Sequence, residues 1–170
     1  MLFRSKNILR KIKEVVNMFN KVNSPKILFF GDNVPYNDIS RFYTASDCYI
    51  LCSRGEGIGL PYAEAMACGR PVIATGWGGH TDFVNETNGF LINYVLKLID
   101  DQSYILKCIN ALGHQWAIPS IDDIRQKMRF VYEFPDIAKA KGLKARADME
   151  QRTWQKAGLW TINRILELNK

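Results

Sequence analysis

The chain has 170 residues, of which 47% are hydrophobic and 24% charged, and this ordinary globular composition excludes a collagen-like, low-complexity or disordered protein. Its length suits one domain with a sizeable core. The formal net charge of +6 allows contact with anionic partners, but the basic residues are spread along predicted helices, so nucleic acid is not an expected partner.

The first predicted element is an amphipathic helix over residues 4–21. Its apolar residues recur at helical spacing with lysines and arginines between them: Leu9, Ile12, Val15, Val16 and Phe19. This pattern fits a helix packed on the domain, which is favoured, or a helix lying on a membrane surface. The stretch is too polar for a transmembrane span and lacks the continuous apolar core of a secretion signal. We therefore expect a cytoplasmic protein, with peripheral membrane association as the alternative.

A glycine-rich loop follows a predicted strand. The strand covers residues 47–51, because this run is short, apolar and bounded by turn residues. Gly57 and Gly59 come shortly after it, and Pro61 suits the start of a short helix over residues 61–68. The loop thus lies at the carboxyl end of a strand, where open parallel sheets bind ligands. Its free backbone N–H groups favour an anion such as a diphosphate.

Two acidic residues flank this loop, Glu56 before the glycines and Glu64 about one turn into the helix. Carboxylates repel a bound diphosphate unless they face hydroxyl groups, and sugars and ribose supply paired hydroxyls. The alternative is that Glu64 only complements the amino end of the helix and that Glu56 is a solvated loop charge. Together with the glycines and Pro61, the two acids favour ligand binding over that alternative.

The chain continues with a short strand and a long insertion. Residues 89–92 are predicted to form the last strand of the sheet, and residues 94–119 an irregular, partly helical insertion. Three amphipathic helices follow, and Thr153 suits the N-cap of the last one. On that helix, Trp154, Trp160 and Ile165 are interpreted as core residues rather than binding residues. The three helices are expected over residues 120–132, 135–149 and 153–168.

The histidines and cysteines do not have the spacing of a metal site. His80 and His114 are far apart in the sequence, whereas Cys48 and Cys52 lie on or beside one strand. Both histidines are interpreted as packed or surface residues. The two cysteines and Cys68 are interpreted as small buried residues of a protein in a reducing compartment. No metal and no cofactor are expected.

The stretch EGIGLPYAE, residues 56–64, resembles the E-x7-E signature of retaining glycosyltransferases of the GT-B fold, the glycogen-synthase-like and mannosyltransferase-like group. The similarity continues through TDFVNETNGFLI and covers roughly residues 25–168. It implies an α/β fold, in which a Rossmann-like parallel sheet is flanked by helices and followed by a helical C-terminal tail. This would be one nucleotide-sugar-binding domain over residues 1–170, with its core at 25–93, the insertion at 94–119 and the tail at 120–170.

The resemblance also implies roles for single residues. Glu64 would bind the ribose of the nucleotide, and Glu56, as the catalytic residue, the hydroxyls of the donor sugar. The remaining donor-binding positions would be Gly57, Ile58, Gly59 and Leu60, through their backbone groups, and Asn33 and Val34 beside the base. The implied reaction is transfer of a hexose from a nucleotide-diphosphate sugar to an acceptor with retention of configuration, without a metal.

The sequence departs from the family pattern at several places. Ile58 and Ile118 replace an aromatic and an acidic residue that are common in the resembled subgroup, and residues 76–80 form a related but different loop. Set against the resembled family, the chain is expected to begin one helix later than the donor-binding domain and to be without the acceptor-binding lobe, so a partner chain or a separate N-terminal lobe is expected. The alternative is a non-catalytic nucleotide-sugar-binding module or a subunit of a split enzyme. A nucleotide-sugar epimerase fits the loop less well.

Overall fold

The structure is a computed structural model and describes residues 10–15, 17, 28, 34–100 and 112–169. The chain forms two compact units, residues 1–36 and 37–170, and each is described by itself. In the first unit, residues 10–15 are helical, and Val34 is half-buried. Of the predicted first helix, residues 4–9, 16 and 18–21 lie outside the described residues. Asn33 lies outside them as well. None of the described helices is both long enough and apolar enough to cross a membrane.

The second unit contains a parallel sheet of three strands, β1 (Tyr49–Leu51), β2 (Val72–Thr75) and β3 (Phe90–Ile92), in the order β1-β2-β3. Ile73 in the central strand pairs with Ile50 on one side and with Phe90 on the other. Two helices, α2 (Ile39–Thr44) and α3 (Leu60–Ala67), and two 3-10 turns, Tyr36–Asp38 and Gly79–Asp82, occur along this part of the chain. The predicted α/β fold with a parallel sheet is confirmed.

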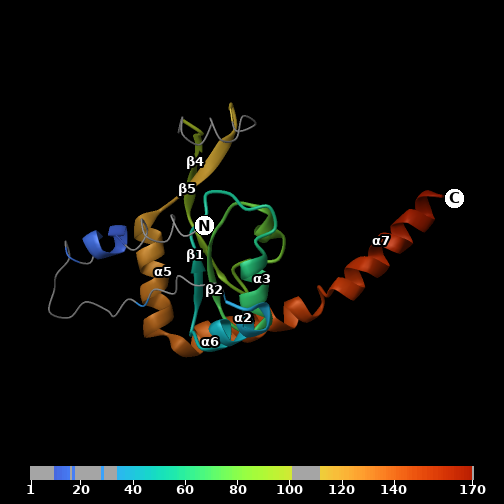
Figure 1. Cartoon of the computed structure of the whole chain (residues 1–170), viewed down its shortest axis with the longest axis horizontal. Helices are drawn as coiled ribbons and strands as arrows, with labels where there is room; N and C mark the ends of the chain where they lie inside the picture. The colour runs from blue at the N-terminus through green and yellow to red at the C-terminus, as the bar shows by residue number, and fades with distance from the viewer. Residues whose placement is uncertain (1–9, 16, 18–27, 29–33, 101–111, 170) are drawn as a thin grey trace. The chain divides into compact units, whose positions relative to one another are not determined.

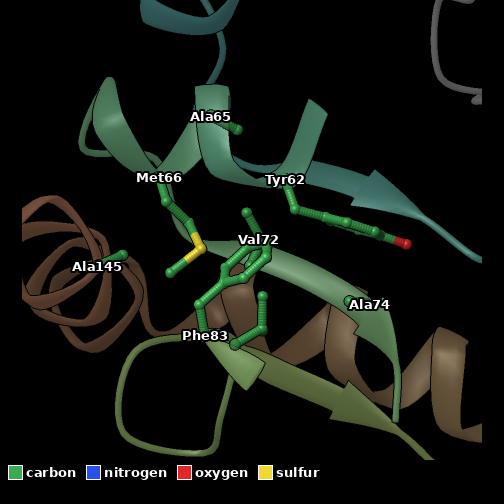
Figure 2. Packing of buried hydrophobic residues seen from close by; sticks show 8 residues of the cluster. Tyr62, Ala65, Met66, Val72, Ala74, Phe83 and Ala145 are labelled. Atoms are coloured by element: carbon green, nitrogen blue, oxygen red, sulfur yellow. The ribbon is translucent and has the colours of Figure 1, made fainter. Parts of the chain in front are cut away.

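The two faces of the sheet are covered by different helices, α3 on one and α5 (Ile121–Glu133) on the other (Figure 1). Successive residues of a strand point to opposite faces, so Val72 and Ala74 join the apolar cluster under α3, while Ile73 joins the cluster under α5. Figure 2 shows the side chain of Met66 on α3 pointing into the cluster between Ala145 and Phe83. Both faces are apolar because a parallel sheet is buried on both sides.

The C-terminal part of the chain forms α5, α6 (Pro135–Glu150) and α7 (Trp154–Leu168). Ser120 and Thr153 cap α5 and α7, since their hydroxyl oxygens accept hydrogen bonds from the N–H groups of Asp123 and Lys156. Helix α6 contributes Ala145 to the cluster under α3 and Ala138 to the cluster under α5. The three predicted helices are confirmed, with boundaries that differ by one residue or less.

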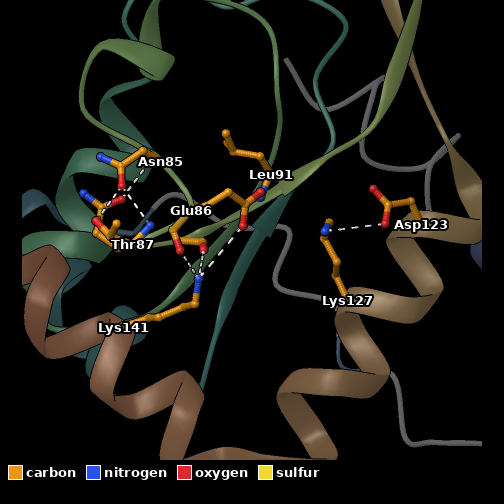
Figure 3. A network of polar contacts seen from close by, with 9 residues as sticks. Asn85, Glu86, Thr87, Leu91, Asp123, Lys127 and Lys141 are labelled. Carbon is orange, nitrogen blue, oxygen red and sulfur yellow. Dashed lines mark hydrogen bonds and ion pairs between the residues drawn. The ribbon is translucent and has the colours of Figure 1, made fainter.

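Polar side chains join α5 and α6 to the segment that leads into and out of β3 (Figure 3). Lys141 of α6 donates to the carbonyl oxygens of Glu86 and Gly89, the latter at 2.8 Å, and burial lowers the pKa of its ammonium group. On α5, a carboxylate oxygen of Asp123 accepts a hydrogen bond from the backbone N–H of Asn93 at 2.6 Å. These contacts fix where the chain leaves the carboxyl edge of the sheet.

For the described parts of residues 94–119, the prediction of irregular, partly helical structure was wrong. The described parts of this segment form an antiparallel ribbon of two strands, β4 (Tyr94–Leu98) and β5 (Gln115–Pro119), with Leu96 opposite Ala117. All five residues of β4 are exposed, so the strand lacks the alternation of buried and exposed residues by which a strand is recognised in a sequence. Its pairing partner lies about twenty residues further on, where local sequence patterns carry no signal.

The interpretation of Trp154, Trp160 and Ile165 as core residues was also wrong. Their side chains are 81%, 72% and 53% exposed, and no described residue of α7 is buried. Helical spacing of apolar residues predicts an apolar stripe, but it does not say which surface covers that stripe. The helix itself was correctly predicted.

Two helical glycines provide a matched test of how closely α6 packs. A methyl group added at Gly142 would lie 2.4 Å from the carbonyl oxygen of Gly69 and 2.9 Å from the ring of Pro71, whereas one at Gly158 of α7 would meet no atom within 4 Å. Alanine favours a helix by about 1 kcal/mol over glycine, so Gly158→Ala is expected to stabilise the protein slightly. Gly142→Ala is expected to lower the free energy of unfolding by about 1–3 kcal/mol through overpacking.

Urea unfolding of both variants checks this pair. Shifts of the same sign and size in the two variants would contradict the close packing of α6 against the segment between α3 and β2.

Candidate functional site

The glycine-rich loop connects the carboxyl end of β1 to α3, as predicted. Gly59 stands at the N-cap of α3 in the left-handed conformation, with φ of 74°, and Pro61 lies in the first turn. A side chain on Gly59 would in addition come 2.6 Å from the ring of Tyr62. Glycine is therefore required there both by the backbone conformation and by the packing. The side chains of Ile58 and Leu60 are exposed, so the amino end of α3 opens to solvent.

A second glycine loop, residues 76–79 after β2, packs directly on the first. The N–H of Gly79 donates to the carbonyl oxygen of Glu56 at 3.0 Å. A methyl group on Gly79 would lie 1.6 Å from the carbonyl oxygen of Gly57. Gly78 has φ of 125°, and a methyl group on it would lie 3.2 Å from the carbonyl oxygen of Glu56. From the sequence, this loop was described only as different from the family pattern. Its two adjacent glycines nevertheless indicate a place where another backbone segment can lie close.

A row of aromatic rings supports both loops. Tyr43 of α2 meets Tyr49 edge to face at 5.5 Å, Tyr49 meets Tyr62 at 5.8 Å, and the ring of Tyr62 lies 4.5 Å from His80. The hydroxyl of Tyr62 donates to the carbonyl oxygen of Leu51 at 2.6 Å. These contacts tie β1, α3 and the second loop together below the amino end of α3.

The interpretation of His80 as a packed residue is confirmed. Its side chain is fully buried, and Nε2 lies 2.6 Å from the carbonyl oxygen of Thr75, so this nitrogen carries the proton. Nδ1 has no hydrogen-bond partner among the described residues. His114 is exposed. His80 thus holds the second glycine loop against the end of β2.

The two acidic residues are both half-buried and lie beside the same aromatic row. The hydroxyl of Tyr43 donates to Oε2 of Glu64 at 2.9 Å, a positioning contact that sequence reasoning missed. Burial and then this hydrogen bond raise the pKa of Tyr43. Burial raises the pKa of Tyr49, and the negative charges of Glu56 and Glu64 raise it further. Both carboxylates are therefore close enough to Tyr49 to raise its pKa.

Next to Glu56 the surface is hollowed, with an open volume of roughly 670 Å³. The hollow is lined by residues of the two glycine loops and of the ribbon, and Glu64 is not among them. The polar residues that line it include Arg54, Glu56 and Gln115, and the aromatic ones are Trp77 and Trp116. The site thus has two ends, an open helix terminus near Glu64 and a hollow near Glu56.

The base-binding pair and the cysteines are the remaining predicted residues. Val34 belongs to the first unit, and Asn33 lies outside the described residues. Cys48, Cys52 and Cys68 are free thiols that are half-buried rather than fully buried, and burial raises the pKa of Cys48 to about 12. Among the described residues, no three or more histidine, cysteine, aspartate or glutamate side chains gather as metal ligands would.

Comparison with known families gives one match that covers more than half of the chain. The model of the family described as Glycosyl transferases group 1 matches residues 6–114. A curated relative, the lipopolysaccharide core biosynthesis mannosyltransferase LpsB of Rhizobium meliloti, is 39% identical over 70 residues, which are 39% of this chain and 19% of LpsB.

Solved structures extend the likeness of fold to nearly the whole chain. The sucrose-phosphate synthase of Thermosynechococcus elongatus superposes with a TM-score of 0.66 at 21% identity, over 95% of this chain and 35% of that one. HepE of Anabaena, in complex with UDP and glucose, superposes with a TM-score of 0.65 at 21% identity, over 97% and 38%. The chain therefore spans little more than a third of the length of these solved proteins.

Proposed function

The chain belongs to the group 1 glycosyl transferases, and from this premise we propose that it is the donor-binding domain of a retaining glycosyltransferase. It would bind a nucleotide-diphosphate sugar and present the hexose for transfer to an acceptor. The observation that carries the proposal is the meeting of the two glycine loops at the carboxyl edge of the sheet, between Glu56 and the amino end of α3. The complexes of HepE with UDP and with UDP-glucose support a nucleotide sugar as the ligand class.

In this proposal the diphosphate lies at the amino end of α3. Pro61 has no backbone N–H, and that of Tyr62 donates to the carbonyl oxygen of Gly59. The donors for an anion therefore come from the loop directly before the helix, where the helix dipole also favours negative charge. Gly57, Ile58, Gly59 and Leu60 offer their backbone groups to the phosphates and the sugar. Gly57 is exposed, and a side chain added to it would meet nothing within 4 Å, so a ligand can approach the backbone closely at this point.

The two carboxylates then hold the two sugar rings of the donor. Glu64 binds the ribose. The hydroxyl of Tyr43 donates to Oε2 of Glu64 at 2.9 Å and so orients the carboxylate. Oε1 has no donor among the described residues and can accept a hydrogen bond from a ribose hydroxyl. Glu56 binds the hydroxyls of the hexose, at the hollow. For Val34 and Asn33, contact with the base rests on the family resemblance alone.

Catalysis would rest on positioning and on electrostatic stabilisation. The bond between the anomeric carbon and the phosphate oxygen breaks, and a bond to the oxygen of an acceptor hydroxyl forms on the same face of the sugar. The proton of that hydroxyl passes to the departing phosphate, and the nucleoside diphosphate leaves. The amino end of α3 would stabilise the charge that develops on the departing phosphate. Glu56 would orient the sugar as it gains positive charge. Acceptor-binding groups from a second lobe or a partner chain would complete the site.

Isothermal titration calorimetry tests this assignment. The chain is titrated with UDP, GDP and ADP, and with UDP-glucose, GDP-mannose and ADP-glucose. One diphosphate is expected to bind, and Glu64→Gln is expected to weaken it by about tenfold or more, because charge-assisted hydrogen bonds contribute about 1.5–3 kcal/mol each. Glu56→Gln is expected to weaken the sugar conjugate while the diphosphate alone binds as before.

Glu133→Gln on the exposed side of α5 is the matched control, since it makes the same change of charge away from the site. The assignment fails if no diphosphate binds to the unaltered chain. It also fails if Glu64→Gln and Glu133→Gln bind the diphosphate equally well.

A further inference from the structure

The β4–β5 ribbon lies where the proposed donor site is hollowed. Three segments that are far apart in the sequence line the hollow: the end of β1 with the first glycine loop, the second glycine loop, and the ribbon. Gln115 and Trp116 of β5, and Ile99 directly after β4, line the hollow together with Glu56 and Trp77. The hollow is therefore not complete without the ribbon.

Specific contacts hold the ribbon against the residues that precede the first glycine loop. The N–H of Ala117 in β5 donates to the carbonyl oxygen of Arg54 at 2.9 Å, and Ala117 is fully buried. The guanidinium of Arg54 lies 4.6 Å from the centre of the Trp116 ring. At the lower end, the N–H of Ser120 donates to the carbonyl oxygen of Asn93 at 2.8 Å. Both strands of the ribbon thus have a fixed position relative to the first glycine loop.

The side chains of the hollow have the chemistry of a sugar subsite. Indole rings, here Trp77 and Trp116, give flat apolar faces that suit the C–H faces of a pyranose. Glu56 and Gln115 supply acceptors and donors for hydroxyl groups, and few polar groups among apolar walls are typical of small-molecule sites. The carboxylate of Glu56 disfavours a phosphate beside it, and the guanidinium of Arg54, which also lines the hollow, is stacked on the Trp116 ring. The hollow therefore fits the uncharged end of a nucleotide sugar better than its diphosphate.

We propose that the ribbon forms one wall of the hexose subsite and that Gln115 helps to determine which hexose is accepted. This rests on the proposed function and adds a residue to it that lies outside the glycine loops. A site that hydrogen-bonds a hydroxyl group discriminates strongly against a substrate that lacks the hydroxyl or holds it in another position, because its polar group is then unpaired. Gln115 pairs with Leu98 in the ribbon through its backbone, and the residue is exposed. Its side chain is therefore dispensable for the fold.

The test measures the affinities of Gln115→Ala for the diphosphate and for its sugar conjugate by calorimetry, using the pair that the unaltered chain binds. The diphosphate is expected to bind within twofold of the unaltered chain. The sugar conjugate is expected to bind about threefold to tenfold more weakly, the loss that fits one uncharged hydrogen bond. Gln126→Ala, at an exposed position on α5, is the matched control and is expected to change neither affinity.

A second variant, Trp77→Leu, removes an aromatic wall and is expected to show the same selective loss. Unchanged affinity of Gln115→Ala for the conjugate would overturn the assignment of the ribbon to the hexose subsite. Equal weakening of the diphosphate and the conjugate would overturn it as well. Failure of the unaltered chain to bind any diphosphate would instead refute the proposed function, so the two failures are distinguishable.

Discussion

Replacement of Gly79 by alanine is expected to disrupt the candidate site and to lower the free energy of unfolding by about 3 kcal/mol or more. The added methyl group would lie 1.6 Å from the carbonyl oxygen of Gly57, and this contact is with backbone, so no side-chain rotation relieves it. The two loops would have to separate, and the hydrogen bond from Gly79 to Glu56 would be lost. Binding of the diphosphate is then expected to disappear, because the first loop no longer has its support.

Urea unfolding and calorimetric titration of Gly79→Ala check both parts of this expectation. Gly57→Ala is the matched control for stability, since a methyl group there meets no atom within 4 Å, and its free energy of unfolding is expected to stay within about 0.5 kcal/mol of the unaltered chain. If Gly79→Ala is as stable as Gly57→Ala, the contact between the two loops is not as close as described.

The second large effect is expected at Tyr62. Its side chain is fully buried, packs against the rings of Tyr49 and His80, and donates a hydrogen bond to the carbonyl oxygen of Leu51. Truncation of a buried aromatic side chain leaves a cavity, so Tyr62→Ala is expected to lower the free energy of unfolding by about 3–5 kcal/mol. Tyr62→Phe keeps the ring and loses only the hydrogen bond, at a cost of about 1–3 kcal/mol.

Chemical unfolding of the two variants separates ring packing from hydrogen bonding. Tyr132→Ala provides the exposed counterpart, since this tyrosine is 78% exposed on α5, and a change of about 0.5 kcal/mol or less is expected. Equal losses in Tyr62→Ala and Tyr62→Phe would show that the packing of the ring contributes little. In that case the aromatic row would not be what supports the glycine loops.

The parts of the fold that the sequence predicts well are those with local signals. Pro61 and the glycines fix the start of α3 because proline presets the first helical turn and glycine tolerates positive φ. The three C-terminal helices could be placed within one residue or less because apolar residues recur with helical spacing, and Thr153 marks the start of the last one. The position of the loop at the carboxyl edge follows from the order of strand, loop and helix.

The contacts that were missed join residues far apart in the sequence. The pairing of Tyr94 with Pro119 makes a ribbon out of a segment that has no strand periodicity. The hydrogen bond between Tyr43 and Glu64 joins two helices whose relative placement only the folded chain defines. For Gly79, the sequence shows a glycine, but not which backbone group lies against it. Periodicity also could not show that the apolar side chains of α7 stay exposed.

The position of α6 determines how cooperatively the domain unfolds. It supplies Ala145 to one side of the sheet and Ala138 to the other, with Gly142 between them against the turn that precedes β2. Neither layer of the core can therefore lose this helix without exposing the other. The sheet, α3 and α6 form one cooperative unit, whose amide protons would exchange with solvent in a single opening event. Helix α7, in which no described residue is buried, opens outside that unit.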